Sequence, residues 1–557
     1  MSASSAISLH RLSYTWPDGS PGLRDVTGTF PTGRTGLTGR NGSGKSTLLR
    51  MISGALAPSS GTISVGGEVA ALPQLLTLHR ETTVASLLGI DRTLAGLRAI
   101  EAGDVDPRHF DAVGDDWDIE ARAAVALDRI GFSALDLDRS VATVSGGEAM
   151  LIAITGLRLR RAPITLLDEP TNNLDRAARA RLGAFVDDWP GTLLVVSHDA
   201  ELLERMEHTA ELHDGALTVF GGPFSAWRAH QEAEQAAAEQ AARAAQQALK
   251  VEKRQRIEAE TKLARRERAG RQTQLGGGIP KILAGRRASS AQEAAGSLRT
   301  TLDDQVRAAQ AAVDDADARV RRDERVSIDL PDPAVPRGRR LIEFAGAERE
   351  IVVQGPERVA LVGANGTGKS SLLERLVRSR GADGEAPGSG QGPHGVPGAP
   401  AAAQSPTRRS GRLLTDRFGY LPQRLDGLDD AASAVENVRS VAPGATPGEI
   451  RNGLARLLLR GASADRPVGT LSGGERFRVS LARLLLADPP AQLLILDEPT
   501  NNLDLASVAQ LTDALNAYRG AILVVSHDLA FLGGIGIETV IEIGADGALR
   551  ARGGLPE

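Results

Sequence analysis

The sequence predicts an α/β protein that contains two copies of one domain, joined by a long helical segment. Three observations lead to this fold. Four short motifs recur in the same order in both halves of the 557-residue chain. Around these motifs, short apolar runs typical of buried strands alternate with helical patterns. Between the halves, residues 229 to about 326 consist mainly of strong helix formers.

The repeated motifs define the two domains. They are "GRNGSGKSTLL" (39–49) and "GANGTGKSSLL" (363–373), "SGGE" (145–148 and 472–475), "LLDEPTNNLD" (166–175) and "ILDEPTNNLD" (495–504), and "LLVVSHD" (193–199) and "ILVVSHD" (522–528). Glu169 and His198 are 29 residues apart, as are Glu498 and His527. We therefore expect domains at residues 1–228 and 327–557, with a linker at 229–326.

Each half is expected to contain a mostly parallel sheet. The runs "ITLLD", "GTLLVVS", "LLILD" and "GAILVVS" are apolar, short and bounded by Gly or charged residues. Continuous apolar runs are typical of strands that are buried on both faces. Helical patterns such as "RFRVSLARLLLA" lie between them.

The halves differ in two insertions. Residues 379–411 are rich in Gly, Pro and Ser, which cannot form a core, and we expect a disordered surface loop there. Gln74 and Ser145 are 71 residues apart, against 49 for Gln423 and Ser472. The first half therefore has the longer helical insert.

The linker is expected to form a helical hairpin. Its first arm, of about 40 residues, would reach roughly 60 Å at ~1.5 Å per residue. The sequence "GGGIP" interrupts the helical pattern, and a second helical run begins near Ser289. The tip is expected near residues 271–290.

Composition excludes several classes of protein. Without cysteine the chain forms no disulfide, zinc-thiolate site or cysteine-held iron-sulfur cluster, which is compatible with the cytoplasmic location that we expect. The N-terminal residues lack the features of a secretory signal. No apolar run approaches the ~20 residues needed to span a bilayer, so the chain cannot form a membrane pore unaided.

Both halves contain a phosphate-binding loop of the form G-x-x-x-x-G-K-[ST], which we call the P-loop. Its backbone N–H groups cradle phosphates at a helix N-terminus, its Lys reaches the β- and γ-phosphates, and its Ser hydroxyl binds Mg²⁺. The residues assigned to nucleotide binding on this basis are Gly39, Asn41, Gly42, Gly44, Lys45, Ser46 and Thr47, and Gly363, Asn365, Gly366, Gly368, Lys369, Ser370 and Ser371.

Paired carboxylates follow an apolar strand in each half. We assign the first acid, Asp168 or Asp497, to Mg²⁺ and the second, Glu169 or Glu498, to general-base catalysis on the attacking water. His198 and His527 end the next strand, where an imidazole could contact the γ-phosphate. A lone His there would more often be an ordinary strand-end residue, but its repetition at the same spacing favours a catalytic role.

The "SGGE" motif, which we call the signature, precedes a helix in each half and offers a second phosphate-binding N-terminus. Its residues are Ser145, Gly146, Gly147 and Glu148, and Ser472, Gly473, Gly474 and Glu475. The alternative is helix capping by Ser, with Glu as a favourable first-turn charge. Capping alone does not require two glycines in both halves.

Together with "LPQ" at Gln74 and Gln423, these motifs resemble those of the ATP-binding cassette superfamily in both halves. The fused pair, the "DEPTNNLD" repeats and the charged linker are similar to the ABC-F subfamily. The resemblance implies two P-loop cassettes, each with an α/β core and a helical subdomain, that sandwich two ATP molecules head to tail. Lys45 would then share a site with Ser472–Glu475, and Lys369 with Ser145–Glu148.

The resemblance also implies an ATPase that uses ATP and Mg²⁺ and that works on the ribosome as a translation factor or an antibiotic-resistance protein. Gln74 and Gln423 would join Ser46, Asp168, Ser370 and Asp497 in binding Mg²⁺, and Tyr14 would stack on adenine. Because both cassettes lie in one chain, we expect a monomer.

Two departures from the family pattern fall on the site that contains Lys369. No aromatic residue near Gly338 replaces Tyr14, since Phe344 is too close to the P-loop. Arg478 follows the second signature, where the first copy has Leu151. We hypothesise that the two sites bind or hydrolyse ATP differently.

Local charge in the linker favours an RNA partner. From Lys250 to Arg287 there are twelve basic residues and four Glu, an excess of +8 in a chain with a net charge of −5. The RNA contacts expected near the tip are Lys262, Arg265, Arg266, Arg268, Arg271, Lys281, Arg286 and Arg287. A solvated helix face is the simpler explanation, although the hairpin and the resemblance favour ribosomal RNA.

Two other classes of ATPase share the motifs of this sequence. The chain could be the ATPase subunit of a drug exporter that acts with a separate membrane protein, although such a subunit has no use for a long basic hairpin. DNA-repair and chromosome-maintenance ATPases usually interrupt one cassette with a coiled coil instead of joining two complete ones.

Overall fold

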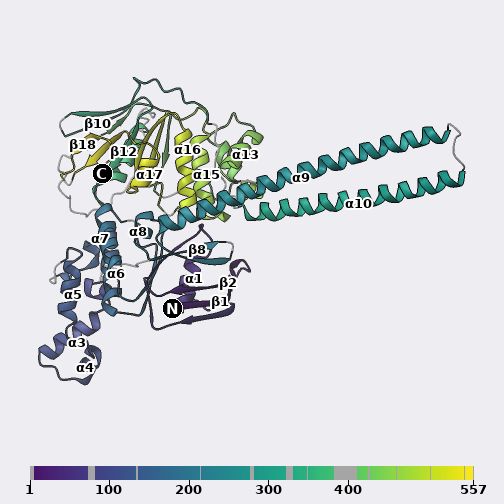
Figure 1. Ribbon diagram of the computed structural model, residues 1–557. Coiled ribbons are helices and arrows are strands. Elements are labelled where there is room, and N and C mark those ends of the chain that lie inside the picture. The colour runs from purple at the N-terminus through teal and green to yellow at the C-terminus, as the bar shows by residue number, and fades with distance from the viewer. Residues whose placement is uncertain are drawn as a thin grey trace. The chain divides into compact units, whose positions relative to one another are not determined.

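The computed structural model describes residues 5–72, 82–132, 136–172, 174–213, 215–275, 281–320, 330–347, 349–381, 411–423, 427–459, 461–501, 503–544 and 546–555. These residues form two units. The first unit spans Met1–Phe224 and Arg325–Glu557, and the second spans Ser225–Glu324 (Figure 1). Gln74 lies outside the described residues.

The first unit contains two six-stranded sheets of the same topology, which confirms the predicted repeat. Their strand orders are β5-β6-β7-β3-β8-β9 and β14-β15-β16-β12-β17-β18, parallel except for the last pair of each. In the first half these strands are β3 (Arg34–Thr38), β5 (Val69–Ala71), β6 (Ile164–Asp168), β7 (Thr192–Val196), β8 (His208–His213) and β9 (Ala216–Gly221). In the second half they are β12 (Arg358–Val362), β14 (Phe418–Leu421), β15 (Leu493–Asp497), β16 (Ala521–Val525), β17 (Thr539–Ile543) and β18 (Leu549–Gly553).

Each half also has a smaller antiparallel sheet of three strands. The strands are β1 (Ser5–Thr15), β2 (Pro21–Pro31) and β4 (Ser60–Val65) in the first half, and β10 (Arg340–Ala345), β11 (Glu350–Gln354) and β13 (Gly411–Leu413) in the second. Register shifts interrupt the β1–β2 pairing at several points, so the alternation of apolar and polar residues is irregular.

The helices follow the strands in the order expected for an α/β fold. In the first half they are α1 (Lys45–Ile52), α2 (Val84–Leu88), α3 (Asp91–Glu101), α4 (Pro107–Val113), α5 (Ile119–Asp128), α6 (Gly146–Arg160), α7 (Arg176–Asp187) and α8 (Ala200–Glu204). In the second they are α11 (Lys369–Gly381), α12 (Ala434–Arg439), α13 (Pro447–Arg456), α14 (Ala462–Asp465), α15 (Gly473–Leu485), α16 (Leu505–Ala517) and α17 (Leu529–Gly534).

The insert before each signature helix forms a helical subdomain, and the first is the longer, as its spacing predicts. It contains α3, α4 and α5, whereas the second contains α13 and the short α14.

The low-complexity segment is only partly described. Helix α11 continues to Gly381 and β13 begins at Gly411, so the ends of the 379–411 segment are structured and do not belong to a loop. Residues 382–410 lie outside the described residues.

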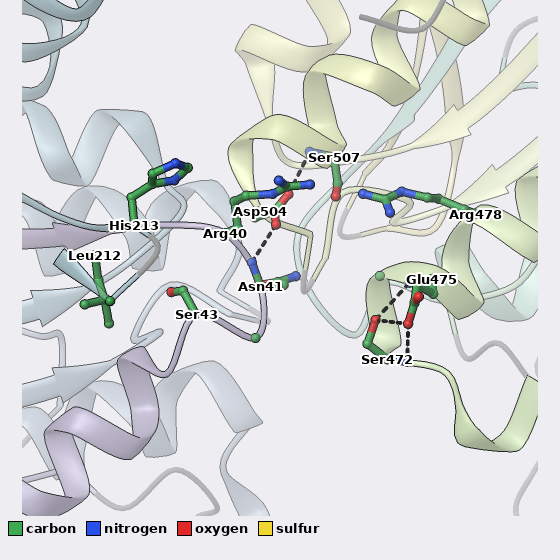
Figure 2. Close-up of a pocket in the computed structure, with 13 residues that line it drawn as sticks. Arg40, Asn41, Ser43, Leu212, His213, Ser472, Glu475, Arg478, Asp504 and Ser507 are labelled. Atoms are coloured by element: carbon green, nitrogen blue, oxygen red, sulfur yellow. Dashed lines mark hydrogen bonds between the residues drawn. The ribbon is translucent and has the colours of Figure 1, made fainter. Parts of the chain in front are cut away.

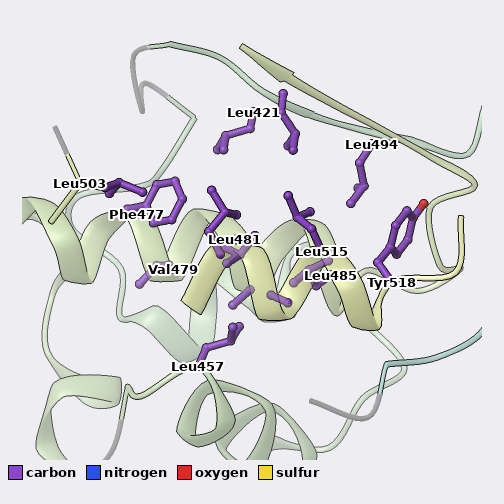
Figure 3. Close-up of a cluster of buried hydrophobic side chains, with 14 of the residues drawn as sticks. Leu421, Leu457, Phe477, Val479, Leu481, Leu485, Leu494, Leu503, Leu515 and Tyr518 are labelled. Atoms are coloured by element: carbon purple, nitrogen blue, oxygen red, sulfur yellow. The ribbon is translucent and has the colours of Figure 1, made fainter. Parts of the chain in front are cut away.

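A buried cluster fixes the second signature helix to its sheet. Phe477, Leu481 and Leu485 of α15 are spaced four residues apart and pack with Leu494 of β15 and Leu515 of α16 (Figure 3). Because residues at i and i+4 lie on one face of a helix, this spacing turns a single face towards the sheet. Each fully buried Leu contributes roughly 1.5–3 kcal/mol relative to an exposed one, so the helix is held firmly and its N-terminus is positioned with it.

The second unit consists of two helices that lie side by side, α9 (Phe224–Leu275) and α10 (Lys281–Arg319) (Figure 1). The ion pairs Arg256–Asp303 (2.8 Å) and Glu267–Arg299 (3.6 Å) join them and run antiparallel, as a hairpin requires. Residues 276–280, between the helices, lie outside the described residues.

The predicted first arm was too short, and the predicted start of the second arm was too late. Helix α9 has 52 residues, because it begins before the predicted linker and continues through Gly270. A single Gly costs only about 1 kcal/mol in a helix, which a long helix tolerates. At ~1.5 Å per residue α9 is roughly 78 Å long. Helix α10 likewise begins at Lys281, ahead of the predicted Ser289.

Within the described part of the chain, every helix is too short or too polar to cross a membrane.

Candidate functional site

The glycines of the P-loops adopt backbone conformations that other residues rarely reach. Gly39 has φ +150°, and a Cβ there would lie 2.5 Å from the carbonyl oxygen of Leu212. Gly44 has φ +96° and leads directly into α1, and a Cβ there would lie 2.5 Å from Leu23. Only glycine allows the loop to fold this tightly against its neighbours, which is the form in which a glycine-rich loop cradles phosphate at a helix N-terminus.

The P-loop lysines are held in the same way in both halves. Lys45 Nζ donates to the carbonyl oxygens of Gly39 and Arg40, at 2.7 and 3.0 Å. Lys369 Nζ donates to the carbonyl oxygens of Gly363 and Ala364, at 2.8 and 3.0 Å. Both side chains are buried, and this burial lowers the pKa of each ammonium while the nearby Glu169 or Glu498 opposes the shift. The ammonium groups are therefore fixed at the mouth of each loop.

The first acid of each pair lies beside a P-loop hydroxyl. Burial raises the pKa of Asp168, and a hydrogen bond from Ser46 opposes this. Asp497 and Ser370 are related in the same way. Oδ1 of each Asp is buried without a hydrogen-bond partner among the described residues. A hydroxyl next to a carboxylate with an unpartnered oxygen fits Mg²⁺, which takes few protein ligands and retains several non-protein ones.

The described residues contain no cluster of three or more His, Cys, Asp or Glu that would hold a metal ion without such outside ligands. Gln423 is exposed just after β14, and its assignment to Mg²⁺ remains a prediction.

The second acid of each pair has an unusual backbone. Glu169 and Glu498 have φ values of 49° and 48°, in the left-handed region that costs a non-glycine residue roughly 1 kcal/mol or more. Glu169 N donates to the carbonyl of Val196 at 2.8 Å, and Glu498 N to that of Val525 at 2.9 Å, which holds each turn against the neighbouring strand. Such strain is typical of functional sites.

Each of these acids contacts the histidine of the next strand. His198 Nε2 lies 3.4 Å from Glu169 Oε1, and the same distance separates His527 Nε2 and Glu498 Oε1. Burial raises the pKa of Glu169 to about 8 and that of Glu498 to about 7, and lowers the pKa of both histidines to about 4. The imidazoles are therefore neutral at pH 7, so these contacts are not ion pairs. A carboxylate with a raised pKa is suited to accept a proton from water.

The signature residues form capping boxes, as the simpler explanation of their sequence predicts. Ser145 N donates to Glu148 Oε2 at 2.8 Å, and Glu148 N donates to Ser145 Oγ at 3.3 Å. Ser472 and Glu475 form the same pair of bonds, at 2.9 and 3.4 Å. The Glu side chains take part in these capping bonds. The assignment of Glu148 and Glu475 to ATP binding stays a prediction.

Capping does not explain the signature glycines. A Cβ at Gly146, Gly473 or Gly474 would meet nothing within 4 Å, so no neighbouring protein atom requires glycine there. The exposed helix N-termini leave room for a ligand to approach the backbone, which supports a second phosphate-binding position.

The sequence analysis did not assign a function to Asp175 and Asp504, the last residues of the repeated "NNLD" motif. Asp504 Oδ1 accepts from Ser507 N (2.7 Å) and caps α16, while its Oδ2 accepts from Asn41 N (2.6 Å) in the first P-loop. Asp175 caps α7 through Ala178 N (2.9 Å) and accepts from Asn365 N (3.2 Å) in the second P-loop. Each Asp therefore links one cassette to the P-loop of the other.

A cavity of about 450 Å³ joins the first P-loop to the second signature. Figure 2 shows Arg40, Asn41 and Ser43 on one side and Ser472 and Glu475 on the other. The structure thus brings together the two motifs that the resemblance pairs in one site. We call this the first composite site, and we call the site that the resemblance implies between the second P-loop and the first signature the second composite site.

The aromatic residue predicted to stack on adenine lies near the first P-loop. Tyr14 packs edge-on against Trp16, with ring centroids 5.1 Å apart, and approaches Gly22, whose carbonyl adjoins Gly44. Phe344, which lies too close to the second P-loop in the sequence to replace Tyr14, is buried in the core of the second half. Stacking of Tyr14 on adenine remains a prediction.

The residues predicted to bind RNA lie on the two helices of the second unit. Lys262, Arg265, Arg266 and Arg268 are exposed on α9. The backbones of Arg271, Lys281, Arg286 and Arg287 are helical, but their side chains lie outside the described part of the structure.

The family profile described as "ABC transporter" matches residues 23–172 and 350–501, more than half of the chain. The chain is 29% identical over 578 residues to the tylosin resistance ATP-binding protein TlrC of Streptomyces fradiae, covering 95% of each protein. It is 28% identical to the probable ATP-binding protein YheS of Escherichia coli K12, covering 91% of this chain and 74% of YheS. It is also 28% identical to ABC transporter F family member 2 of Arabidopsis thaliana, covering 98% and 78%.

The solved structures show the same fold at lower identity. One described as "Model of ribosome-bound archaeal Pelota and ABCE1" gives a TM-score of 0.53 at 18% identity, covering 98% of this chain and 78% of that one. Another, "RNase-L Inhibitor", gives 0.51 at 18% identity, covering 97% and 90%. Together with the duplicated P-loops, signatures and carboxylate pairs, these matches show that the chain belongs to the ABC transporter family, as a tandem-cassette protein of the ABC-F type that binds and hydrolyses ATP.

Proposed function

We propose that this ATPase binds the ribosome through its helical hairpin, and that ATP-dependent closure of its two cassettes positions the hairpin near the peptidyl-transferase region. The role would be that of a translation factor or of an antibiotic-resistance protein that protects the ribosome. The name of the relative TlrC, a tylosin resistance protein, supports the second role.

The observation that carries the proposal is the length and charge of the hairpin. Helix α9 is 52 residues long, and the excess of twelve basic over four acidic residues lies between Lys250 and Arg287, at its far end and around the turn. Nearer its start, α9 is stabilised by pairs such as Arg228–Glu232 and Arg243–Glu239. The positive charge is therefore concentrated where a projecting arm would meet RNA phosphates.

The catalytic assignments remain part of the proposal. Lys45 and Lys369 would bind the phosphate tail, and Glu169 and Glu498 would accept the proton of the attacking water. Ser46 with Asp168, and Ser370 with Asp497, would hold Mg²⁺, which neutralises phosphate charge when bound. The neutral imidazoles of His198 and His527 lie beside the bases, where each would contact the γ-phosphate.

A pelleting experiment tests ribosome binding. The double variant Glu169→Gln, Glu498→Gln binds ATP but lacks both bases, so it should remain closed and sediment with ribosomes when ATP is present. The same variant without ATP, and a Lys45→Ala, Lys369→Ala variant with ATP, serve as controls. If the trapped variant stays in the supernatant at moderate salt, or sediments only with membranes, the proposal is wrong.

The hairpin charges can be tested separately through the salt dependence of binding. Replacing Lys262, Arg265, Arg266 and Arg268 with Ala should reduce the slope of log affinity against log salt by about 3, since each phosphate contact contributes roughly 0.7–0.9. Arg228 and Arg243, in ion pairs nearer the start of α9, provide a matched control. Equal slopes for the two sets of variants would show that α9 does not contact phosphates.

A further inference from the structure

A groove of about 580 Å³ lies in the first cassette, outside the ATP-binding motifs. It is formed by one face of α5, by the C-terminal end of α6, and by the end of α7 with the turn that follows it. We call it the arginine groove. Its lining includes Val125, Phe185 and four arginines, Arg122, Arg129, Arg158 and Arg161.

The arginine groove lies at the opposite end of α6 from the signature. Arg158 follows Ser145 by 13 residues, so at ~1.5 Å per residue it lies roughly 20 Å along the helix from the signature. Helices α6 and α7 lead into β6 and β7, so the groove adjoins the start of these strands, whereas Asp168 ends β6. A ligand in the groove would therefore leave the ATP-binding motifs free.

Two of the four arginines are engaged by neighbouring groups. Arg122 forms ion pairs with Asp116 and with Asp118 (Nε–Oδ1 2.9 Å). Arg158 Nη1 donates to the carbonyl of Phe185 at 3.1 Å, and its guanidinium lies over the ring of the same residue, 4.9 Å from the centroid. The carbonyl and the ring are neutral, so these contacts place the charge of Arg158 without cancelling it.

The other two arginines can offer their charge to a ligand. Arg129 and Arg161 are exposed, and among the residues that the structure describes their side chains form no hydrogen bond or ion pair. Burial, and then the proximity of Arg129, lower the pKa of Arg158, while Asp188 opposes the shift. Like charges are therefore close together on this surface, and an anion would relieve their repulsion.

The ends of the helices explain only part of this pattern. Arg129 and Arg161 occupy the C-cap positions of α5 and α6, where a basic side chain interacts favourably with the helix dipole. That effect does not account for Val125, which lies four residues before Arg129 on the same face of α5 and is 62% exposed. Leu159 and Pro190 extend the apolar lining. The groove therefore suits a ligand that carries both apolar side chains and carboxylates.

The second half carries different residues at the matching positions. Counted from the signature Ser and from the second acid of each pair, the replacements are Leu485 for Arg158, Asp488 for Arg161 and Ala514 for Phe185. Leu485 and Ala514 are buried in the hydrophobic core of the second half. The arginine groove is therefore a feature of the first cassette, and the repeated ATPase fold does not require it.

We propose that the arginine groove binds an acidic segment of another protein, with apolar side chains in the groove and carboxylates on Arg129 and Arg161. RNA would supply anions but no aliphatic side chain to cover Val125. A membrane surface is broad, whereas a groove of this volume accommodates a few side chains. The inference goes beyond ribosome binding through the hairpin and does not depend on it.

Selection from a phage-displayed library of random peptides tests the proposal on the full-length protein. The library is first depleted on the Arg129→Glu, Arg161→Glu variant, which removes peptides that bind elsewhere. Peptides then enriched on the unchanged protein should combine Asp or Glu with apolar residues. By fluorescence anisotropy, a labelled synthetic copy should bind the depleting variant about tenfold more weakly, the combined effect of two exposed ion pairs. Val125→Asp should also weaken binding, and the depletion step does not impose this result.

Matched variants separate the groove from net charge and from misfolding. Arg228→Glu with Arg243→Glu, on α9, changes the net charge by the same amount and should leave the affinity unchanged. Arg129→Lys with Arg161→Lys keeps the charge at both helix ends and should retain most of the binding. An unchanged ATPase rate in the groove variants shows that the cassettes still fold.

Three results would overturn the proposal. The first is that no peptide is enriched, or that the enriched peptides lack acidic residues or bind Val125→Asp equally well. The second is a dimer in sedimentation that the Arg129→Glu, Arg161→Glu variant abolishes, which would assign the groove to a second copy of the chain. The third is binding to phosphatidylserine vesicles that the same variant loses, which would assign it to an anionic lipid surface.

Discussion

Replacing Asp504 with Ala should lower kcat/KM for ATP at the first composite site. The fall should be larger than the loss of a helix N-cap alone would cause. The side chain makes two hydrogen bonds, from Ser507 N at 2.7 Å and from Asn41 N at 2.6 Å. Loss of an N-cap costs about 1 kcal/mol of stability. Loss of a hydrogen bond to a charged group costs about 1.5–3 kcal/mol, and this one spans the two cassettes.

The catalytic effect can be separated from the effect on stability. If the bond from Asn41 is made in full only when the cassettes are closed, kcat/KM for ATP should fall by roughly ten- to a hundredfold, since about 1.4 kcal/mol corresponds to a factor of ten. Asp175→Ala should have a smaller effect, because its bond from Asn365 N is longer, at 3.2 Å.

Ser433→Ala is the control, because Ser433 caps α12 away from the P-loops. A fall in kcat/KM for Asp504→Ala no larger than that for Ser433→Ala would contradict the proposed role of the bond from Asn41 N.

Three further outcomes are expected. Gly39→Ala should abolish ATP binding in the first P-loop, because the added Cβ would lie 2.5 Å from Leu212 O; normal affinity by calorimetry would contradict this. With Glu498→Gln, kcat/KM should rise with pH to a midpoint near 8, because Glu169 with its pKa raised to about 8 must lose its proton to act as a base. With Glu169→Gln the midpoint should lie near 7, the pKa of Glu498, and a flat profile in either variant would exclude these bases. Removal of Mg²⁺ by a chelator should stop hydrolysis until Mg²⁺ is restored, and a full rate in the chelator would refute the metal assignment.

The parts that the sequence predicted correctly are local ones. A strand, a glycine-rich turn and the first turn of a helix are specified by a dozen neighbouring residues, so the P-loops and the strands that end in carboxylate pairs could be placed. The same applies to the signatures, whose Ser and Glu are three residues apart and form capping boxes.

The remaining features depend on residues that are distant in the sequence. Asp175 and Asp504 look like ordinary helix caps, and only the approach of the other cassette gives their second oxygen a partner. The left-handed backbone of Glu169 is imposed by the neighbouring strand, since it is held by the carbonyl of Val196. The smaller sheets escaped prediction because register shifts in β1 disrupt the period of two.

Helix α9 exceeded its predicted length of about 40 residues because it begins at Phe224 and continues through Gly270, a residue type that is unfavourable within helices. A glycine ends a helix when the chain turns there, but this glycine lies where the second helix still runs alongside the first. The ion pair between Glu267 and Arg299 continues the contact between the helices almost to this position.

The head-to-tail composite site is the central structural claim, and cysteine crosslinking tests it most directly. The chain contains no native cysteine, so introduced pairs have no background. With ATP and a short bismaleimide, Arg40→Cys should crosslink to Arg478→Cys, since both line one cavity. Arg40→Cys paired with Ser145→Cys should not react, because Ser145 is an exposed residue of the first signature and belongs to the other composite site. Failure of the first pair, or equal yields for both, would contradict the account.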